Sequence, residues 1–168
     1  MSRALLAMFV LATGAFATAV TLASSTDGGA TKSPIYGVTL PEGYRHWEFI
    51  APAQELPPLN ELRVVVGNDI AVKAYRDGTL PFPDGSILVK LAWKHEHSDE
   101  FAPAFVPGDP TTVQVMIKDG KRYAASGGWG FGRFVAGKPV DAAQHQTCLA
   151  CHAANVKEHD LVFTRYAP

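Results

Sequence analysis

Alternating and β-branched hydrophobic patterns mark several strands along the chain. Residues 62–66 are a short run rich in Val, and residues 86–94 and 111–118 alternate between two sets of side chains. Successive side chains of a strand point to opposite faces, so each of the two longer segments presents one mainly apolar face. A further strand is predicted over residues 45–50.

Turn signals predict how these strands are connected. The proline-containing residues 51–58 are predicted to form a loop, and so is the charged stretch 94–100, whose polar side chains suit contact with water. The pair Asp119-Gly120 predicts a hairpin turn that leads into a strand over residues 121–125.

Two helices begin at side chains that are typical of N-caps. Asn68 precedes a helical pattern over residues 69–76, and Asp141 precedes a longer one over residues 142–156. The sequence therefore predicts a mainly β (α+β) domain, in which an antiparallel sheet is accompanied by a few helices and the C-terminal helix carries residues 142–156.

The N-terminus has the pattern of an export signal. Arg3 is followed by an uncharged apolar stretch, and small residues then provide cleavage sites, so residues 1–23 are predicted to be a signal peptide. Residues 24–35 are predicted to be a flexible linker and residues 36–168 the folded domain. A membrane anchor is the alternative reading of the apolar stretch. Cleavage would place the domain in the periplasm.

Composition excludes two classes of protein. Hydrophobic residues make up 47% of the chain and charged residues 18%, which is unlike a disordered tail. The 15 Lys and Arg residues are balanced by 16 Asp and Glu residues, so no electrostatic footprint for a nucleic acid is present.

The most informative pattern is Cys148-Leu149-Ala150-Cys151-His152, a CxxCH motif. This spacing is that of covalent c-type haem attachment. Two thiols on one helical turn can reach the two vinyl groups on one edge of a porphyrin, and His152 can then ligate the iron. A redox-active dithiol, a zinc site and a structural disulfide are the alternatives, but the first lacks a βαβ context and the second a full ligand set.

The sixth iron position decides what such a haem does, because electron carriers fill it with Met or His. After export Met116 is the remaining methionine. His145 and His159 share the region of His152 and cannot reach the opposite haem face. His95 and His97 lie in the predicted loop. The pattern favours an open or exchangeable sixth site.

Lys90 and Gln114 each interrupt a partly apolar face in the middle of a predicted strand. That face is either the solvent side of the sheet or the wall of a cofactor pocket. A buried lysine can exist as a neutral amine, which is a nucleophile or a ligand.

Several segments together resemble the cytochrome P-460 family, whose close relatives are the β-sheet cytochromes c′. The resemblance covers residues 40–167. It is carried by the haem motif, by the tail Asp160-Leu161-Val162-Phe163-Thr164-Arg165-Tyr166, and by Gly43-Tyr44-Arg45, Arg76-Asp77-Gly78, Gly85-Ser86-Ile87-Leu88-Val89-Lys90, Val115-Met116-Ile117-Lys118-Asp119, Lys121-Arg122-Tyr123-Ala124 and Gly128-Trp129-Gly130-Phe131.

The resemblance implies a periplasmic homodimer with one five-coordinate haem c held by Cys148, Cys151 and His152. It also implies oxidation of hydroxylamine or a related small nitrogen species, with electrons passing to a redox partner cytochrome. In this family a lysine is bonded to the porphyrin edge, and Lys90 matches its position. The β-sheet cytochromes c′ lack that bond and bind nitric oxide.

Gln114 is a departure from the hydroxylamine-oxidising members, which have a distal carboxylate at the matching position. An amide can donate a hydrogen bond but cannot accept a proton at accessible pH. Gln114 and Met116 are the predicted distal residues, and a base from Glu96, Asp99 or Glu100 is one way to compensate. A nitric oxide binder without turnover and a simple electron carrier remain the alternative functions.

Overall fold

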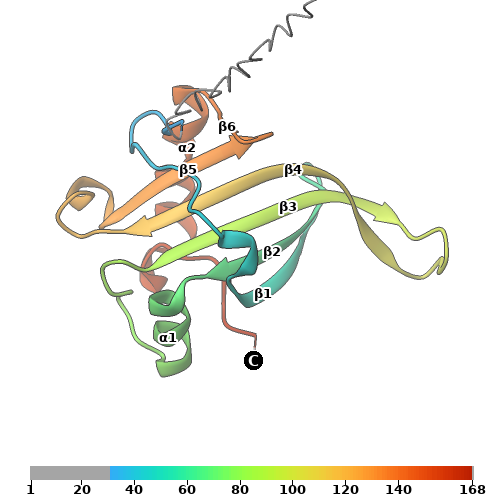
Figure 1. The fold of residues 1–168 in the computed structure, drawn as a ribbon, viewed down its shortest axis with the longest axis horizontal. Helices are drawn as coiled ribbons and strands as arrows, with labels where there is room; N and C mark the ends of the chain where they lie inside the picture. Colours follow the sequence, from blue (N-terminus) through green and yellow to red (C-terminus); the bar gives the residue numbers. More distant parts are fainter. Residues whose placement is uncertain (1–30, 168) are drawn as a thin grey trace, which may run out of the picture.

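The computed structural model describes residues 31–167, and the predicted signal peptide lies outside them. The described residues form a six-stranded antiparallel sheet in the order β1-β2-β3-β4-β5-β6, so every neighbour in space is a neighbour in sequence (Figure 1). The strands are β1 (Glu48–Glu55), β2 (Glu61–Gly67), β3 (Ile87–His97), β4 (Phe105–Lys118), β5 (Trp129–Val135) and β6 (Lys138–Pro139).

The two helices begin where their caps were predicted. In α1 (Asp69–Asp77) the Asn68 side chain accepts a hydrogen bond from the Ala71 amide, and Gly78 ends the helix in the left-handed conformation. In α2 (Ala142–Val156) the Asp141 side chain accepts from the Gln144 amide. Short 3-10 helices η1 (Tyr44–His46), η2 (Ala124–Ser126) and η3 (Lys157–His159) complete the structure. The prediction of a mainly β fold with a C-terminal helix is confirmed.

The first strand lies further along the chain than the pattern predicted. Residues 44–46 form η1, and β1 extends through the segment that was predicted to be a loop. Pro52 is tolerated in β1 because β1 is an edge strand, where a missing N–H leaves no neighbouring strand unpaired.

The predicted strand over residues 121–125 is absent from the structure. The Asp119 carboxylate accepts hydrogen bonds from the Lys121 and Arg122 amides, which folds the chain into a turn. The next strand, β5, therefore begins only at Trp129. A Cβ atom at Gly130 would overlap the Tyr123 ring, so the backbone packs closely in this glycine-rich segment.

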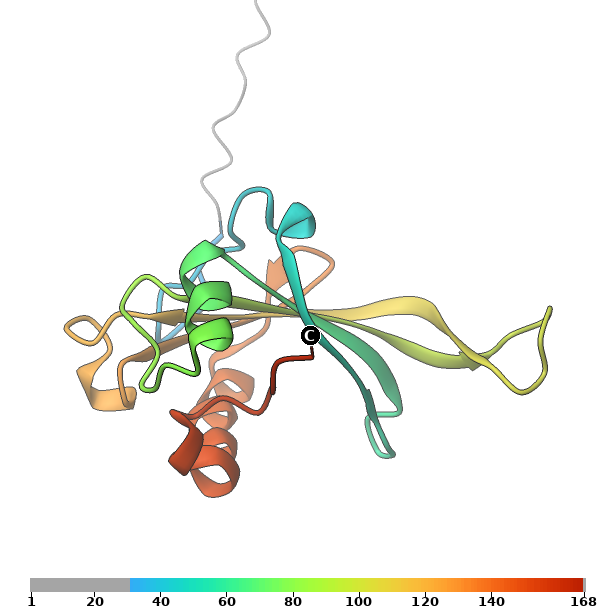
Figure 2. The ribbon, with the colours of Figure 1, turned by 90° about the horizontal axis from the view of Figure 1, so that it is seen from below.

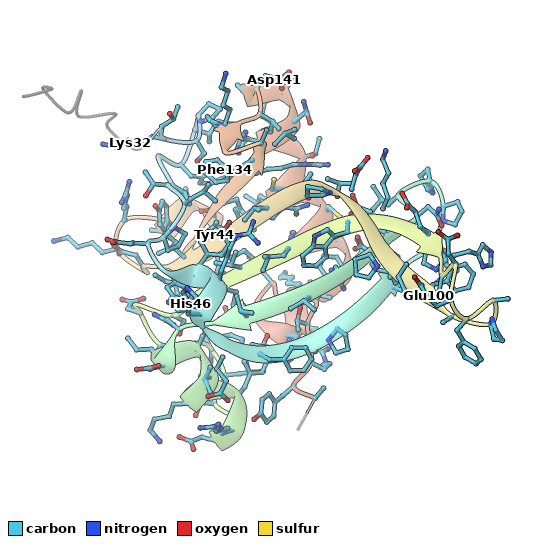
Figure 3. All side chains as sticks on the ribbon, turned by 45° about the vertical axis from the view of Figure 1, so that its right-hand side comes forward. Lys32, Tyr44, His46, Glu100, Phe134 and Asp141 are labelled. Carbon is cyan, nitrogen blue, oxygen red and sulfur yellow. The ribbon has the colours of Figure 1, made fainter. Side chains whose placement is uncertain are left out.

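The predicted loop over residues 94–100 was also wrong for its first half, because β3 continues to His97. The last part of β3 pairs with the first part of β4. These two strand ends and the loop between them, which contains Glu100, project beyond the sheet as an arm (Figures 1 and 3). The rings of His95 and His97 lie 3.9 and 4.2 Å from the Phe105 ring, and these contacts favour the extended pairing.

The two faces of the sheet are covered differently. The segment containing η1 lies on one side, and α2 with the C-terminal tail lies on the other (Figure 2). Val38, Val89 and Phe134 belong to the core on the η1 side. Leu88 and Phe131, with Trp129, belong to the core that includes the tail residue Val162. Among residues 31–167 no helix is long and apolar enough to cross a membrane.

Candidate haem site

Helix α2 presents a stripe of three functional side chains to the sheet. His145, Cys148 and His152 recur at intervals of three and four residues, which places them on one helix face. His145 is fully buried; its Nε2 accepts a hydrogen bond from the Arg133 amide at 3.0 Å, and its Nδ1 donates to the Asp141 carbonyl at 2.8 Å. Both ring nitrogens of His145 are therefore engaged, and this residue anchors α2 to β5.

His152 has the hydrogen-bond arrangement of an axial ligand. Its Nδ1 donates to the Leu161 carbonyl at 2.6 Å, which leaves the Nε2 lone pair for a metal. Its ring meets the Phe131 and Phe163 rings edge-on, at centroid distances of 5.1 and 4.9 Å. Burial lowers the pKa of His152 below its ordinary value, so the imidazole is neutral at physiological pH, as ligation requires.

All six residues predicted for the site line one cavity between α2 and the sheet. The cavity has a volume of about 270 Å³ and is partly open to solvent. The predicted residues around it are Lys90, Gln114, Met116, Cys148, Cys151 and His152. The sheet face that carries Lys90 and Gln114 is therefore a cavity wall.

The two cysteines are free thiols that border this cavity. Cys148 is half-buried, and its burial raises the pKa of the thiol above the ordinary value, whereas Cys151 is exposed. Reactive dithiols of redox enzymes have a lowered pKa at the attacking cysteine. The environment of Cys148 thus argues against that alternative.

Residues that pair across neighbouring strands form rows on the sheet side of the cavity. Lys90 pairs with Val65 on one side and with Gln114 on the other, and Gln114 pairs with Arg133. Two residues earlier on β3, the next row on the same face joins Leu88 to Met116 and Met116 to Phe131. The Phe131 ring contacts His152. Met116 is thus one row closer than Gln114 to the ring that touches the imidazole.

Two carboxylates in the cavity were not predicted. Oε2 of Glu55 lies 2.8 Å from Nζ of Lys90, and Oε1 of Glu55 lies 3.2 Å from Arg63. Glu61 is 3.7 Å from Lys90 and accepts a hydrogen bond from the Thr111 hydroxyl at 2.6 Å. Burial opposes ionisation of Glu55, but Lys90 and Arg63 outweigh it and lower the pKa of this carboxyl. Glu55 is consequently ionised at neutral pH.

The carboxylates proposed from the sequence lie elsewhere. Glu96, Asp99 and Glu100 belong to the projecting arm and do not line the cavity. Strands β3 and β4 carry them away because their pairing continues beyond Lys94. Glu55 and Glu61 stand instead at the two ends of the β1–β2 connection, and this hairpin bends towards the α2 side (Figure 2).

The donors and walls of the cavity fit a haem. Two thiols and an imidazole stand on α2, and Val65, Leu88 and Phe131 provide an apolar wall. Within the described residues, the buried Nε atoms of Arg63 and Arg133 have no hydrogen-bond partner. Both side chains line the cavity, so two cationic donors are available for carboxylates such as haem propionates.

Comparison with protein families decides the relationship. The family model for cytochrome P460 matches residues 41–164, which is most of the chain. The chain belongs to the cytochrome P460 family. Comparison with curated proteins found no match.

Membership of the cytochrome P460 family makes this protein a c-type haem cytochrome. The matched span runs from just before η1 to Thr164, so it contains every cavity residue named above. The family resemblance predicted from the CxxCH motif and the C-terminal tail is confirmed.

Proposed function

We propose that this cytochrome P460 protein oxidises hydroxylamine or a related small nitrogen species at an open haem iron in the periplasm. The observation that carries the proposal is that Lys90 lines the same cavity as the CxxCH motif. By the family resemblance, a lysine bonded to the porphyrin distinguishes the oxidising cytochromes from those that only bind nitric oxide, and Lys90 matches the position of that lysine.

Residues of α2 hold the cofactor in this proposal. Cys148 and Cys151 would hold the haem through thioether bonds, and Nε2 of His152 would ligate its iron. The haem would supply an iron that accepts electrons from the substrate. Arg63 and Arg133 would pair with the propionates, which would satisfy their buried Nε atoms.

The carboxylates take the protons that oxidation releases. On the way from hydroxylamine to nitric oxide each electron removed is accompanied by one proton. Glu55 is ionised and is hydrogen-bonded to Lys90, so it can accept a proton where Gln114 cannot. The Gln114 amide donates to the Thr112 hydroxyl at 3.1 Å, so a neighbouring side chain holds it in place.

Lys90 is the proposed link to the porphyrin edge. Forming that C–N bond would break a porphyrin C–H bond and an amine N–H bond, and it would pass two electrons to an added oxidant such as peroxide. The contact at 2.8 Å places Glu55 where it could accept one of the two protons released.

The test starts from the protein matured in a host that attaches c-type haem. Mass spectrometry of proteolytic peptides should find haem on the Cys148–Cys151 peptide and an adduct on the Lys90 peptide. Hydroxylamine should then reduce an artificial electron acceptor in the presence of the protein, and a His152→Ala variant is the matched control. Haem without hydroxylamine-dependent reduction would reject the oxidase proposal.

Nitric oxide binding without turnover is the second candidate. Gln114 in place of a carboxylate favours it, because an amide in this cavity cannot take up the protons of an oxidation. A spectrum that changes with nitric oxide while hydroxylamine is not oxidised would identify this function. A six-coordinate, low-spin spectrum that does not change when small ligands are added would instead identify an electron carrier with Met116 or a histidine on the iron.

Export, a redox partner cytochrome and a homodimer complete the proposal. The sheet surface around Leu62, Val64 and Trp93 forms an apolar groove with Pro107 of the arm. That surface suits a second copy of the chain. Sedimentation of the matured protein tests the dimer, and N-terminal sequencing tests the removal of residues 1–23.

A further inference from the structure

The tail that follows α2 makes an unusual turn at two residues. Asp160 and Leu161 have φ values of 48° and 63°, the left-handed region that side chains other than glycine rarely adopt. Strained backbone of this kind persists only where its surroundings hold it in place.

Four hydrogen bonds hold Asp160. Its carboxylate oxygens lie 2.7 and 2.9 Å from Nζ of Lys118, and one of them also accepts from the Phe82 amide at 2.8 Å. Its backbone carbonyl accepts from Nε1 of Trp129 at 2.8 Å. Lys118 donates in addition to the Gly127 carbonyl at 3.1 Å. The side chains of Lys118 and Asp160 are 8% and 12% exposed, so their ion pair is buried.

The turn brings a carbonyl to the back of the haem ligand. The Leu161 amide donates to the Val156 carbonyl at 3.1 Å, and the Leu161 carbonyl accepts from Nδ1 of His152 at 2.6 Å. The Leu161 side chain is buried against Gly127, where an added Cβ would lie 2.9 Å from it. The carbonyl therefore has little freedom to move away from the imidazole.

We propose that the buried Lys118–Asp160 pair is a positioning device that presses the Leu161 carbonyl against His152 and thereby lowers the reduction potential of the haem. A strong hydrogen bond from Nδ1 increases the electron density on the imidazole, which favours oxidised iron. Lys118 and Asp160 act through Leu161 and touch no reacting atom. The inference rests on ligation by His152 in the proposed function and is independent of the substrate.

The test uses Lys118→Met, which leaves Asp160 without its partner. Loss of a positive charge alone would lower the reduction potential, whereas a weaker hydrogen bond to His152 raises it. The proposal therefore expects a higher potential than in the parent protein, together with a lower iron–histidine stretching frequency in the reduced protein. Lys118→Arg should restore the parent values. Lys94→Met, which breaks the exposed pair with Asp109, is the matched control.

Trp129→Phe is a milder variant that guards against misfolding. It removes one hydrogen bond to the Asp160 carbonyl without changing charge, and it should raise the potential by a smaller amount. A potential that falls in Lys118→Met, or that stays unchanged in Trp129→Phe, would overturn the proposal. Both measurements need only bound haem, so a protein that fails to oxidise hydroxylamine still gives a decisive answer.

Discussion

Lys90 and Glu55 meet in a half-buried ion pair with an N–O distance of 2.8 Å, although 35 residues separate them along the chain. Lys90 stands on β3 and Glu55 at the end of β1, and β2 lies between the two strands. The pair therefore depends on the bend of the β1–β2 hairpin as well as on register. It places a carboxylate beside the lysine that matches the family's haem-linked position.

Glu55→Gln should reduce hydroxylamine turnover, because it removes the ionised proton acceptor while keeping the size of the side chain. General-base assistance is worth about 10²–10⁴ in rate, so a loss of about 10² or more is expected in kcat. Glu48→Gln removes a carboxylate from an exposed pair with Arg76 and is the control. An unchanged kcat in Glu55→Gln would assign the proton to another group.

Gln114→Glu should increase turnover, since it returns a carboxylate to the position where the oxidising relatives have one. The neighbouring Arg133 and Lys90 in the same row would favour its ionised form. Steady-state reduction of an acceptor dye by hydroxylamine measures the effect. Equal rates in the parent and in Gln114→Glu would mean that Glu55 already supplies all the base that the reaction needs.

Acid should destabilise the protein partly through Glu55. Its pKa lies below the ordinary value of 4.5 in the folded protein, so the unfolded chain binds the proton more readily. The stabilisation is fully present above that ordinary value and is lost as the pH falls through the folded pKa. Urea unfolding of the parent from about pH 7 to about pH 3 should therefore lose more free energy than unfolding of Glu55→Gln. Parallel pH profiles would contradict this.

The sequence pattern predicted most of the strands and both helices, because strand alternation and helix caps depend on residues that are close together in the chain. Asp141 marked the start of α2, and the spacing from Cys148 to His152 marked the haem site. Glu55 was missed because its segment was interpreted as a loop on account of Pro52. Only the position of β1 at the edge of the sheet makes that proline compatible with a strand.

Contacts between residues far apart in the chain could not be predicted from the sequence pattern. Lys118 and Asp160 are separated by 42 residues and meet only after β4 and the tail pack together. The Nε atoms of Arg63 and Arg133, which have no hydrogen-bond partner within residues 31–167, are likewise recognised only once both side chains face one cavity. Charge and spacing along the chain carry no signal for such pairs.

Cys148→Ala and Cys151→Ala should each leave a haem held by one thioether. The reduced pyridine haemochrome band then moves to longer wavelength, because one vinyl group stays conjugated with the ring. In the double variant the proposed Lys90 bond should be the remaining covalent link to the haem under denaturing conditions. A denaturing gel stained for haem separates these cases, and loss of covalent haem in the double variant would contradict the proposed Lys90 bond.

Arg133→Gln should lower the reduction potential of the haem. Arg133 lines the cavity and its Nε is buried without a partner among the described residues, so a propionate there would gain a charge-assisted hydrogen bond. Removing that cation leaves the propionate charge less compensated, which favours oxidised iron. Arg63→Gln should act in the same direction but less strongly, because Glu55 already neutralises part of its charge at 3.2 Å. Redox titration of both variants checks the order, with exposed Lys73→Gln as the control. Unchanged potentials in both would place the propionates elsewhere.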